Sequence, residues 1–272
     1  MNKIKAKFES LAALFGFFMI YKKIRVGKIF DHWYKGQKKS QALQDIYAEV
    51  YGTDYNEEIE PGGYIGMGEL KYIADHLCIE NGQSLIDLGC GRGGPGMWIA
   101  RETKCSLTGV DISAVGIDHC KKRAIDFDLN GQTNFYVGDI CRTEKSDSSY
   151  DGAISIDTLV LVSDKLAAIK EVKRILKPNA RFILTSWEAD LPFAIKDYKV
   201  MMQNAGFEVE EYYEISNWKQ RQLDVYAGIL ASKKRIIKEM GKKDSNMFIR
   251  EAKNTSLVID HMRHILLVAR NI

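Results

Sequence analysis

The sequence predicts an α/β protein built on a doubly wound sheet, and three observations support this prediction. Short apolar segments alternate with helix-like segments from residue 84 to residue 186, which is typical of a parallel sheet covered on both faces. A glycine-rich turn directly follows the first apolar segment, and acidic residues stand at or just after the ends of successive apolar segments. With 272 residues, 46% of them hydrophobic, the chain can bury a large core without disulfides or a structural metal.

The individual elements follow from the same alternation. Lys177-Pro178-Asn179 ends the helix before the fifth strand, because proline cannot continue a helix. Gly206 stands where a helix would end before the sixth strand. The expected strands cover residues 84–88, 105–110, 133–137, 152–156, 181–186, 207–215 and 265–269. The expected helices cover residues 68–77, the stretch from the glycine-rich turn to 101, 113–129, 164–176 and 197–205, with a mostly helical stretch at 218–264.

The N-terminal segment differs in charge from the rest of the chain. Residues 1–39 hold ten Lys or Arg and two acids, or +8, so the remaining residues carry about −5 of the net charge of +3. The apolar run at residues 11–21 is too short to span a bilayer, which takes about 20 residues. Its apolar positions repeat at helical spacing and predict a helix. Three roles stay open: packing on its own domain or a dimer partner, a lid, or membrane-surface contact of residues 1–30.

Composition also narrows the compartment and the class of partner. The five cysteines are odd in number and none form a C-x-x-C pair, which disfavours a disulfide framework and a zinc site. We therefore expect a cytoplasmic protein without a metal site. The mildly acidic body disfavours a groove that follows nucleic-acid phosphates, so we expect no nucleic-acid partner.

The glycine-rich turn predicts a nucleotide-type binding site. Gly89, Gly91 and Gly94 satisfy G-x-G-x-x-G between a strand and a helix, and Asp111 ends the next strand 22 residues after Gly89. Asp87, two residues before the first glycine, would be a poor neighbour for the pyrophosphate of a dinucleotide. A third acid, Asp139, follows the third strand. Three acids near strand ends suit S-adenosylmethionine, which carries a sulfonium and an ammonium group and no phosphate.

The chain resembles the class I S-adenosylmethionine-dependent methyltransferases. The matching motifs are Leu-Ile-Asp-Leu-Gly-Cys-Gly-Arg-Gly-Gly at 85–94, Val-Asp-Ile-Ser at 110–113, Gly-Asp-Ile at 138–140, and the strands at 150–156 and 176–184. The resemblance implies a Rossmann-like seven-stranded sheet in the order 3-2-1-4-5-7-6 with the last strand antiparallel. It also implies an N-terminal helical cap or lid at 1–50 and a methyltransferase domain at 51–272, in which residues 218–264 form a helical cap insertion.

The same resemblance implies the residues that bind the cofactor. The segment 51–63 is similar to a loop that closes over the cofactor in small-molecule methyltransferases. Isoleucines after the second, third and fourth strands would flank the adenine or the sulfonium. The implied cofactor-binding residues are Asp87, Gly89, Gly91, Gly93, Asp111, Ile112, Asp139, Ile140, Ile156, Tyr55 and Gly63.

Within the family, the chain is most similar to the small-molecule branches: phosphoethanolamine, sarcosine/dimethylglycine and natural-product methyltransferases. It lacks the Asn/Asp-Pro-Pro-Tyr/Phe motif of enzymes that methylate base amines. Leu161 stands where the phosphobase branch has a histidine, which puts phosphoethanolamine in doubt. The candidate catalytic residues are Asp157, His32 and His261. The candidate acceptor-binding residues are Asp157, Trp187, Glu188, Tyr64 and Trp218.

Each candidate also has a simpler interpretation. Asp157 is equally suited to cap the turn that follows it, and Trp187 to pack in the core. His264, like His261, is a possible base just before the last strand. An amine acceptor with a free lone pair needs no base, and Asp157 with Glu188 would suit such an amine, with Trp187 stacked on it.

The sequence thus predicts methyl transfer from S-adenosylmethionine to an N, O or C atom of a small-molecule acceptor by in-line displacement, giving S-adenosylhomocysteine. We expect a monomer or homodimer. The alternatives are a protein of this fold that binds without catalysis and an NAD-dependent oxidoreductase.

Overall fold

A seven-stranded sheet forms the centre of the molecule. The computed structural model describes residues 23–59, 64–191 and 194–272, and the predicted helix at 11–21 lies outside these ranges. The strand order is β3-β2-β1-β4-β5-β7-β6, as expected, and only β7 runs antiparallel to its neighbours. The strands are β1 (Ser84–Leu88), β2 (Ser106–Asp111), β3 (Thr133–Val137), β4 (Tyr150–Ile156), β5 (Leu176–Ala189), β6 (Phe207–Glu214) and β7 (Met262–Asn271).

Helices cover both faces of this sheet, because successive strand residues point to opposite faces. Leu85 and Ile183 pack with the helices α4, α5 and α6, whereas Ile86 and Phe182 pack with α7 and α8. Because these strands are buried on both faces, they appear in the sequence as nearly continuous apolar runs. The helices are α4 (Met67–His76), α5 (Gly94–Thr103), α6 (Ala114–Arg123), α7 (Lys165–Ile175) and α8 (Tyr198–Asn204).

Several boundaries differ from the expected ones. The second helix ends at Arg123 rather than at residue 129, and the chain continues in turns to Asp128, whose φ is +56°. Lys177-Pro178-Asn179 lies within β5, directly after the helix end at Ile175. The last strand starts at Met262, three residues earlier than expected, and this earlier start matters for the site.

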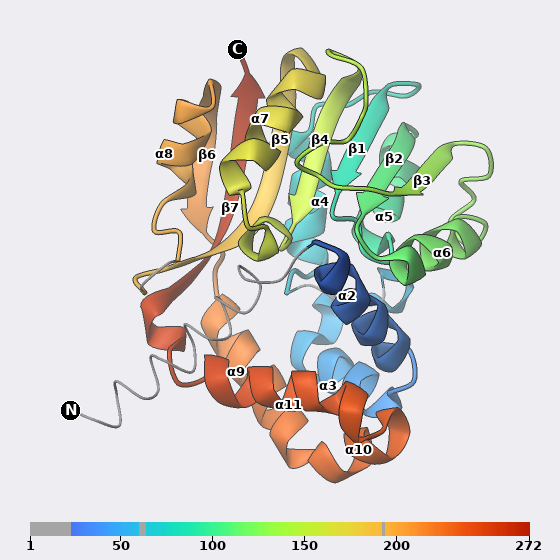
Figure 1. Ribbon diagram of the computed structural model, residues 1–272, viewed down its shortest axis with the longest axis vertical. Helices are drawn as coiled ribbons and strands as arrows, with labels where there is room; N and C mark the ends of the chain where they lie inside the picture. Colours follow the sequence, from blue (N-terminus) through green and yellow to red (C-terminus); the bar gives the residue numbers. More distant parts are fainter. Residues whose placement is uncertain (1–22, 60–63, 192–193) are drawn as a thin grey trace.

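A second group of helices lies beyond the carboxyl ends of the parallel strands (Figure 1). Leu43 and Ile46 of α3 pack against Val225 and Ile229 of α9 and Phe248 of α11 in a separate apolar cluster. Among the described helices, none is long and apolar enough to cross a membrane. The group consists of α2 (Lys23–Gln37), α3 (Gln41–Tyr51), α9 (Trp218–Ala231), α10 (Lys233–Met240) and α11 (Lys242–Thr255).

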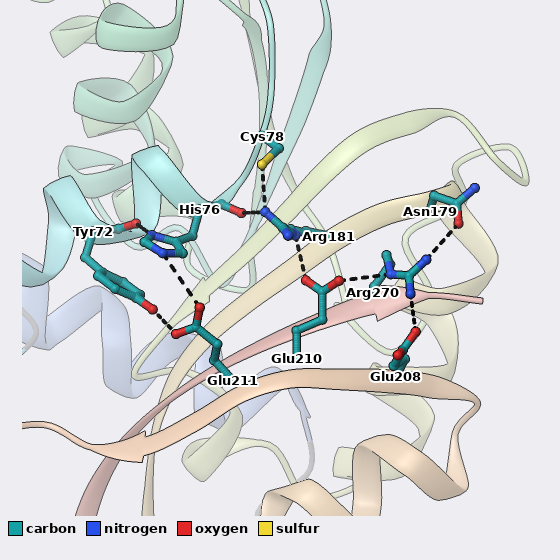
Figure 2. A network of polar contacts seen from close by, with 9 residues as sticks. All are labelled: Tyr72, His76, Cys78, Asn179, Arg181, Glu208, Glu210, Glu211 and Arg270. Atoms are coloured by element: carbon teal, nitrogen blue, oxygen red, sulfur yellow. Dashed lines mark hydrogen bonds and ion pairs between the residues drawn. The ribbon is translucent and has the colours of Figure 1, made fainter.

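A polar network fastens β6 to the rest of the sheet, at the end away from these helices (Figure 2). Glu210 accepts hydrogen bonds from Arg181 of β5 at 2.7 Å and from Arg270 of β7 at 2.9 Å. Arg181 also donates to the carbonyl oxygen of His76 at the end of α4. The acids on this edge strand are therefore occupied in holding the sheet together. The remaining members of the network are Tyr72, Cys78, Asn179, Glu208 and Glu211.

Candidate active site

A cavity of about 440 Å³ lies between the carboxyl ends of β1, β4 and β5 and the group of helices beyond them. Its walls come from α2, the loop before α4, the glycine-rich turn, α9 and α11. Ligands of doubly wound sheets bind at this end of the strands. The cavity is therefore the candidate active site.

The glycine-rich turn needs glycine at specific positions. Gly89, Gly91 and Gly93 have φ values of +78°, +55° and +80°, a region that other residues rarely adopt. A Cβ atom on Gly89 would also collide with the side chain of Thr158. All three glycines line the cavity, so a ligand can approach the backbone closely.

Asp87 places a buried carboxyl group on the cavity wall. Its side chain is 2% exposed, and among the described residues it has no hydrogen-bond partner. Burial, with a smaller contribution from the charge of Asp111, raises the pKa of Asp87 to about 8. A buried carboxyl without a partner is unfavourable as an anion, and a cationic ligand in the cavity would relieve this cost.

Asp111 and Asp139 lie near the turn but do not line the cavity. Asp111 accepts hydrogen bonds from the backbone N–H groups of Gly91 at 2.9 Å and Ser113 at 2.7 Å. Burial raises the pKa of Asp111 to about 6, although these hydrogen bonds oppose the shift. The carboxylate of Asp139 accepts from the N–H of Cys141. Of the three isoleucines expected beside the ligand, Ile156 alone is on the cavity wall.

The helix α2 packs against the start of α6 and against the glycine-rich turn. Asp31 accepts hydrogen bonds from Ser113 Oγ at 2.6 Å and from the N–H of Val115 at 3.1 Å, so it caps the start of α6. A Cβ atom on Gly27 would lie 2.8 Å from the carbonyl oxygen of Ile112, and one on Gly91 would lie 2.8 Å from the hydroxyl of Tyr34. The helix thus lies against the residues expected to hold the nucleoside.

Asp157 follows β4 and is held by groups from three other segments. Its φ of +52° is unusual for a non-glycine residue. Its Oδ2 accepts from the N–H of Tyr64 at 2.9 Å, and its Oδ1 accepts from Thr185 Oγ1 at 2.9 Å and pairs with His264 Nε2 at 2.6 Å. Burial alone would raise the pKa of Asp157, but His264 and these hydrogen bonds outweigh it and hold the pKa below its usual value. Asp157 is therefore an anion on the cavity wall, and its carboxylate does not cap the following turn.

His264 lies in the sheet behind Asp157. Its side chain is fully buried, and its ring stacks on that of Trp187 with centroids 4.2 Å apart and planes 5° apart. The candidates His32 and His261 are exposed and are not among the residues that line the cavity. The strand alternation could have identified His264, because it shares a sheet face with Leu266 and Val268. The expected last strand began at residue 265, so it did not include His264.

The acceptor-binding candidates separate into two groups. Tyr64 and Trp187 line the cavity, with their rings edge to face at 5.6 Å. Trp218 packs behind Trp187 and donates to Glu214 at 2.6 Å. Glu188 does not reach the cavity, because neighbouring residues of a strand point to opposite faces.

On that opposite face, Glu188 accepts hydrogen bonds from the N–H of Tyr198 at 2.7 Å and the hydroxyl of Tyr212 at 2.6 Å. Of the remaining candidates, Tyr55 lines the cavity and Gly63 lies outside the described ranges. Within those ranges there is no group of three or more His, Cys, Asp or Glu that could hold a metal ion.

The helix α11 supplies cavity residues that were not singled out from the sequence. Glu251 is the most notable of them, because its carboxyl group contacts the hydroxyls of Tyr64 and Tyr226. The signal available in the sequence was a set of side chains at spacings of three and four on one helix face. The cavity-lining residues of this face are Lys243, Asn246, Met247, Arg250 and Glu251.

Comparison with known proteins gives a family match. A family model described as a methyltransferase domain matches residues 79–253, more than half of the chain. The methyltransferase phqN of Penicillium fellutanum is 36% identical over 111 residues, which is 41% of this chain and 34% of that protein. The chain spans only about a third of the length of the first two curated relatives that it matches.

Solved structures share the fold. The [4+2]-cyclase SpnF superimposes with a TM-score of 0.72 at 19% identity, over 92% of this chain and 96% of that one. Phosphoethanolamine N-methyltransferase 2 of Haemonchus contortus, solved with phosphomonomethylethanolamine and S-adenosylhomocysteine, gives 0.66 at 19% identity over 83% and 56%. Since one of these proteins is described as a cyclase, fold alone does not assign the reaction.

Proposed function

Since the chain belongs to the methyltransferase domain family, we propose that it transfers a methyl group from S-adenosylmethionine to a small-molecule acceptor, leaving S-adenosylhomocysteine. One observation carries the proposal: the same cavity is lined by Asp87 and the glycine-rich turn, which we name its donor end, and by Asp157 and Trp187, which we name its acceptor end. A donor and an acceptor can therefore meet within it. A cytoplasmic location and a monomeric or homodimeric state belong to the same proposal.

The residues of the donor end, Asp87 and the glycine-rich turn, fit S-adenosylmethionine. Asp87, buried and without a partner in the described part of the chain, suits the positively charged end of the ligand. The glycines of the turn would let the ligand approach the backbone closely, and Ile156 would lie beside the ligand. This assignment would satisfy the carboxyl group of the wall for which residues 23–59, 64–191 and 194–272 provide no hydrogen bond.

The nucleoside would be held by Asp111, Ile112, Asp139 and Ile140. Because Gly27 lies against Ile112 in this structure, α2 has to shift for the nucleoside to reach this place. The helix would then close over the bound ligand, which is the role of a cap. Tyr55 and Gly63 belong to the loop proposed to close with it.

The chain's own residues would mainly align the acceptor and exclude water. S-adenosylmethionine supplies a methyl group on a positively charged sulfur, so the leaving group is neutral. Alignment of reacting groups can supply about 7–11 kcal/mol of the barrier. Asp157, fixed by three segments, would orient the acceptor, with Tyr64 and Trp187 as its walls. No histidine needs to act as a base if the acceptor has a free lone pair.

Methyl transfer is tested by product formation. The protein is incubated with S-adenosylmethionine and, one at a time, with small amines, alcohols and carboxylic acids, and S-adenosylhomocysteine is quantified in a single turnover. Acceptor-dependent S-adenosylhomocysteine supports the proposal. Tight binding of S-adenosylmethionine without product from any acceptor would favour a binding protein, and reduction of NAD would favour an oxidoreductase.

A further inference from the structure

The acceptor end of the cavity consists of Tyr64, Asp157, Trp187, Tyr226 and Glu251. These residues come from the loop before α4, the end of β4, β5, α9 and α11. Two of the five are acids and the other three are aromatic. The acceptor end therefore combines negative charge with π-faces, and this combination points to one class of ligand.

Tyr64 links the two acids. Its backbone N–H donates to Asp157 Oδ2 at 2.9 Å, and its hydroxyl donates to Glu251 Oε1. The two carboxyl groups thus lie at opposite ends of one tyrosine. The hydroxyl of Tyr226 donates to the same oxygen of Glu251 at 3.1 Å, so the position of Glu251 is fixed from two sides.

The two acids differ in how their charge is balanced. Asp157 pairs with His264 and has a lowered pKa. Glu251 contacts only tyrosine hydroxyls, and within residues 23–59, 64–191 and 194–272 no Lys or Arg lies at ion-pair distance from it. Burial raises the pKa of Glu251, while the two tyrosine hydrogen bonds oppose this shift. A carboxylate that is half-buried and has no cation beside it is unfavourable, and the cavity lies next to Glu251.

Three cations also line the cavity, Arg92 in the glycine-rich turn and Lys243 and Arg250 on α11, but in the described part of the chain none lies at ion-pair distance from Glu251. Lys243 and Arg250 lie on the same helix, and both are exposed. Solvent screens charges in such positions, whereas Tyr64, Trp187 and Tyr226 of the acceptor end are buried or half-buried. The acceptor end therefore offers a ligand two carboxyl groups and no Lys or Arg.

Building on the proposed function, we propose that the acceptor is an amine that is positively charged in water. Its ammonium group would lie between Glu251 and Asp157, and it would pass one proton to the Glu251 carboxylate before the freed lone pair of the nitrogen attacks the methyl group. It would also contact the faces of Tyr64, Trp187 and Tyr226, which attract cations. Glu251 would then set the specificity of the site for amines over alcohols and acids of the same shape.

Three probes with the same aromatic body test this inference. The affinities of 2-phenylethylammonium, 2-phenylethanol and phenylacetate are measured by calorimetry on the protein saturated with S-adenosylhomocysteine. We expect the ammonium probe to bind about tenfold or more tighter than the alcohol, as one charge-assisted contact in a desolvated pocket provides. We expect Glu251→Gln to abolish that preference and to leave the affinity for the alcohol unchanged.

A matched variant removes the same charge outside the cavity. Asp224 is exposed on α9 and contacts Gln220, so Asp224→Asn should keep the preference for the ammonium probe. Equal affinities for the three probes, no binding of the ammonium probe, or a preference that survives in Glu251→Gln would each overturn the inference. A uniform loss for all probes in Glu251→Gln would also overturn it, because it would indicate a structural role.

The same titrations separate this inference from the function on which it depends. S-adenosylhomocysteine is titrated first into the wild-type protein. If it does not bind, the proposed function fails and the inference with it. If it binds and the probes show no preference for the cation, only the inference fails.

Discussion

The imidazole Nε2 of His264 lies 2.6 Å from Oδ1 of Asp157, although β5 separates their strands in the sheet. Thr185 of that intervening strand donates to the same carboxylate oxygen at 2.9 Å. Three strands thus meet at one carboxylate. Asp157 lies on the cavity wall, and Trp187 covers the imidazole behind it.

We predict that His264→Leu destabilises the protein by about 3–5 kcal/mol at neutral pH, because a buried carboxylate loses its partner. The folded-state pKa of Asp157 is lowered, so the stability that it contributes is present above its unfolded pKa of about 4 and is lost as the pH falls further. Urea unfolding at pH 7 and at pH 3.5 measures the effect. The penalty should shrink at the lower pH, and an equal penalty at both would show that the contact of His264 with the Asp157 carboxylate is not what stabilises the fold.

Asp87 should have the opposite pH dependence. Its folded-state pKa is raised to about 8, so the fold favours the neutral acid, and stability is lost as the pH rises from about 4 toward 8. We predict that Asp87→Asn is more stable than the wild type at pH 8 and nearly equal to it at pH 4. Urea unfolding across this range measures the difference. The exposed Asp126 provides a control, and Asp126→Asn should show no such trend.

The glycine-rich turn offers a comparison of two glycines with similar backbones. Gly89 and Gly82 have φ values of +78° and +84°, but a Cβ atom on Gly82 would meet nothing within 4 Å. Gly82→Ala should cost about 1 kcal/mol of backbone strain. Gly89→Ala should cost more and should weaken S-adenosylmethionine binding at least tenfold, because Thr158 is displaced.

Thermal melts and ligand titrations of the two glycine variants provide the measurement. Thr158 Oγ1 donates to the carbonyl oxygen of Gly89 at 3.0 Å. Displacing Thr158 would therefore also remove a hydrogen bond that holds the turn. Similar losses in both variants would show that backbone strain, and not the collision, controls the turn.

The contact between α2 and α6 should control entry of the ligand. Asp31→Ala removes the hydrogen bonds to Ser113 and Val115, at a cost of about 1 kcal/mol for a lost cap. If α2 has to shift for the nucleoside to bind, the variant should bind S-adenosylmethionine with a faster association rate. Stopped-flow fluorescence of Trp33, which lies on α2, reports the step. Asp118→Ala on the exposed side of α6 should leave the rate unchanged, and a slower rate in Asp31→Ala would contradict the account.

The positions of the strands and the glycine-rich turn were predictable from the sequence because they depend on local patterns. Apolar runs, turn glycines and the acids Asp87, Asp111 and Asp139 are separated by short stretches of chain, and the expected sheet is the observed one. The family resemblance supplied the order of the strands, including the antiparallel last strand. These features needed no knowledge of distant contacts.

The acceptor end was less predictable, because it depends on tertiary packing. Glu188 is adjacent to Trp187 in sequence, yet the strand directs it to the other face of the sheet. His264 reaches Asp157 only because β7 begins at Met262 and sits two strands away from β4. Glu251 joins the site only because α11 packs over it. Local patterns can place each of these side chains on a face of its strand or helix, but tertiary packing decides what that face meets.

The most direct test of the central claim is a calorimetric titration of S-adenosylmethionine and of NAD into the wild-type protein and Asp87→Asn. Asp87 is the buried carboxyl group of the cavity wall for which the described residues provide no partner, so it should bind the cationic ligand. We predict one S-adenosylmethionine per chain, an affinity at least tenfold weaker in Asp87→Asn, and no binding of NAD. Binding of NAD, or an S-adenosylmethionine affinity that is the same in both proteins, would contradict the account.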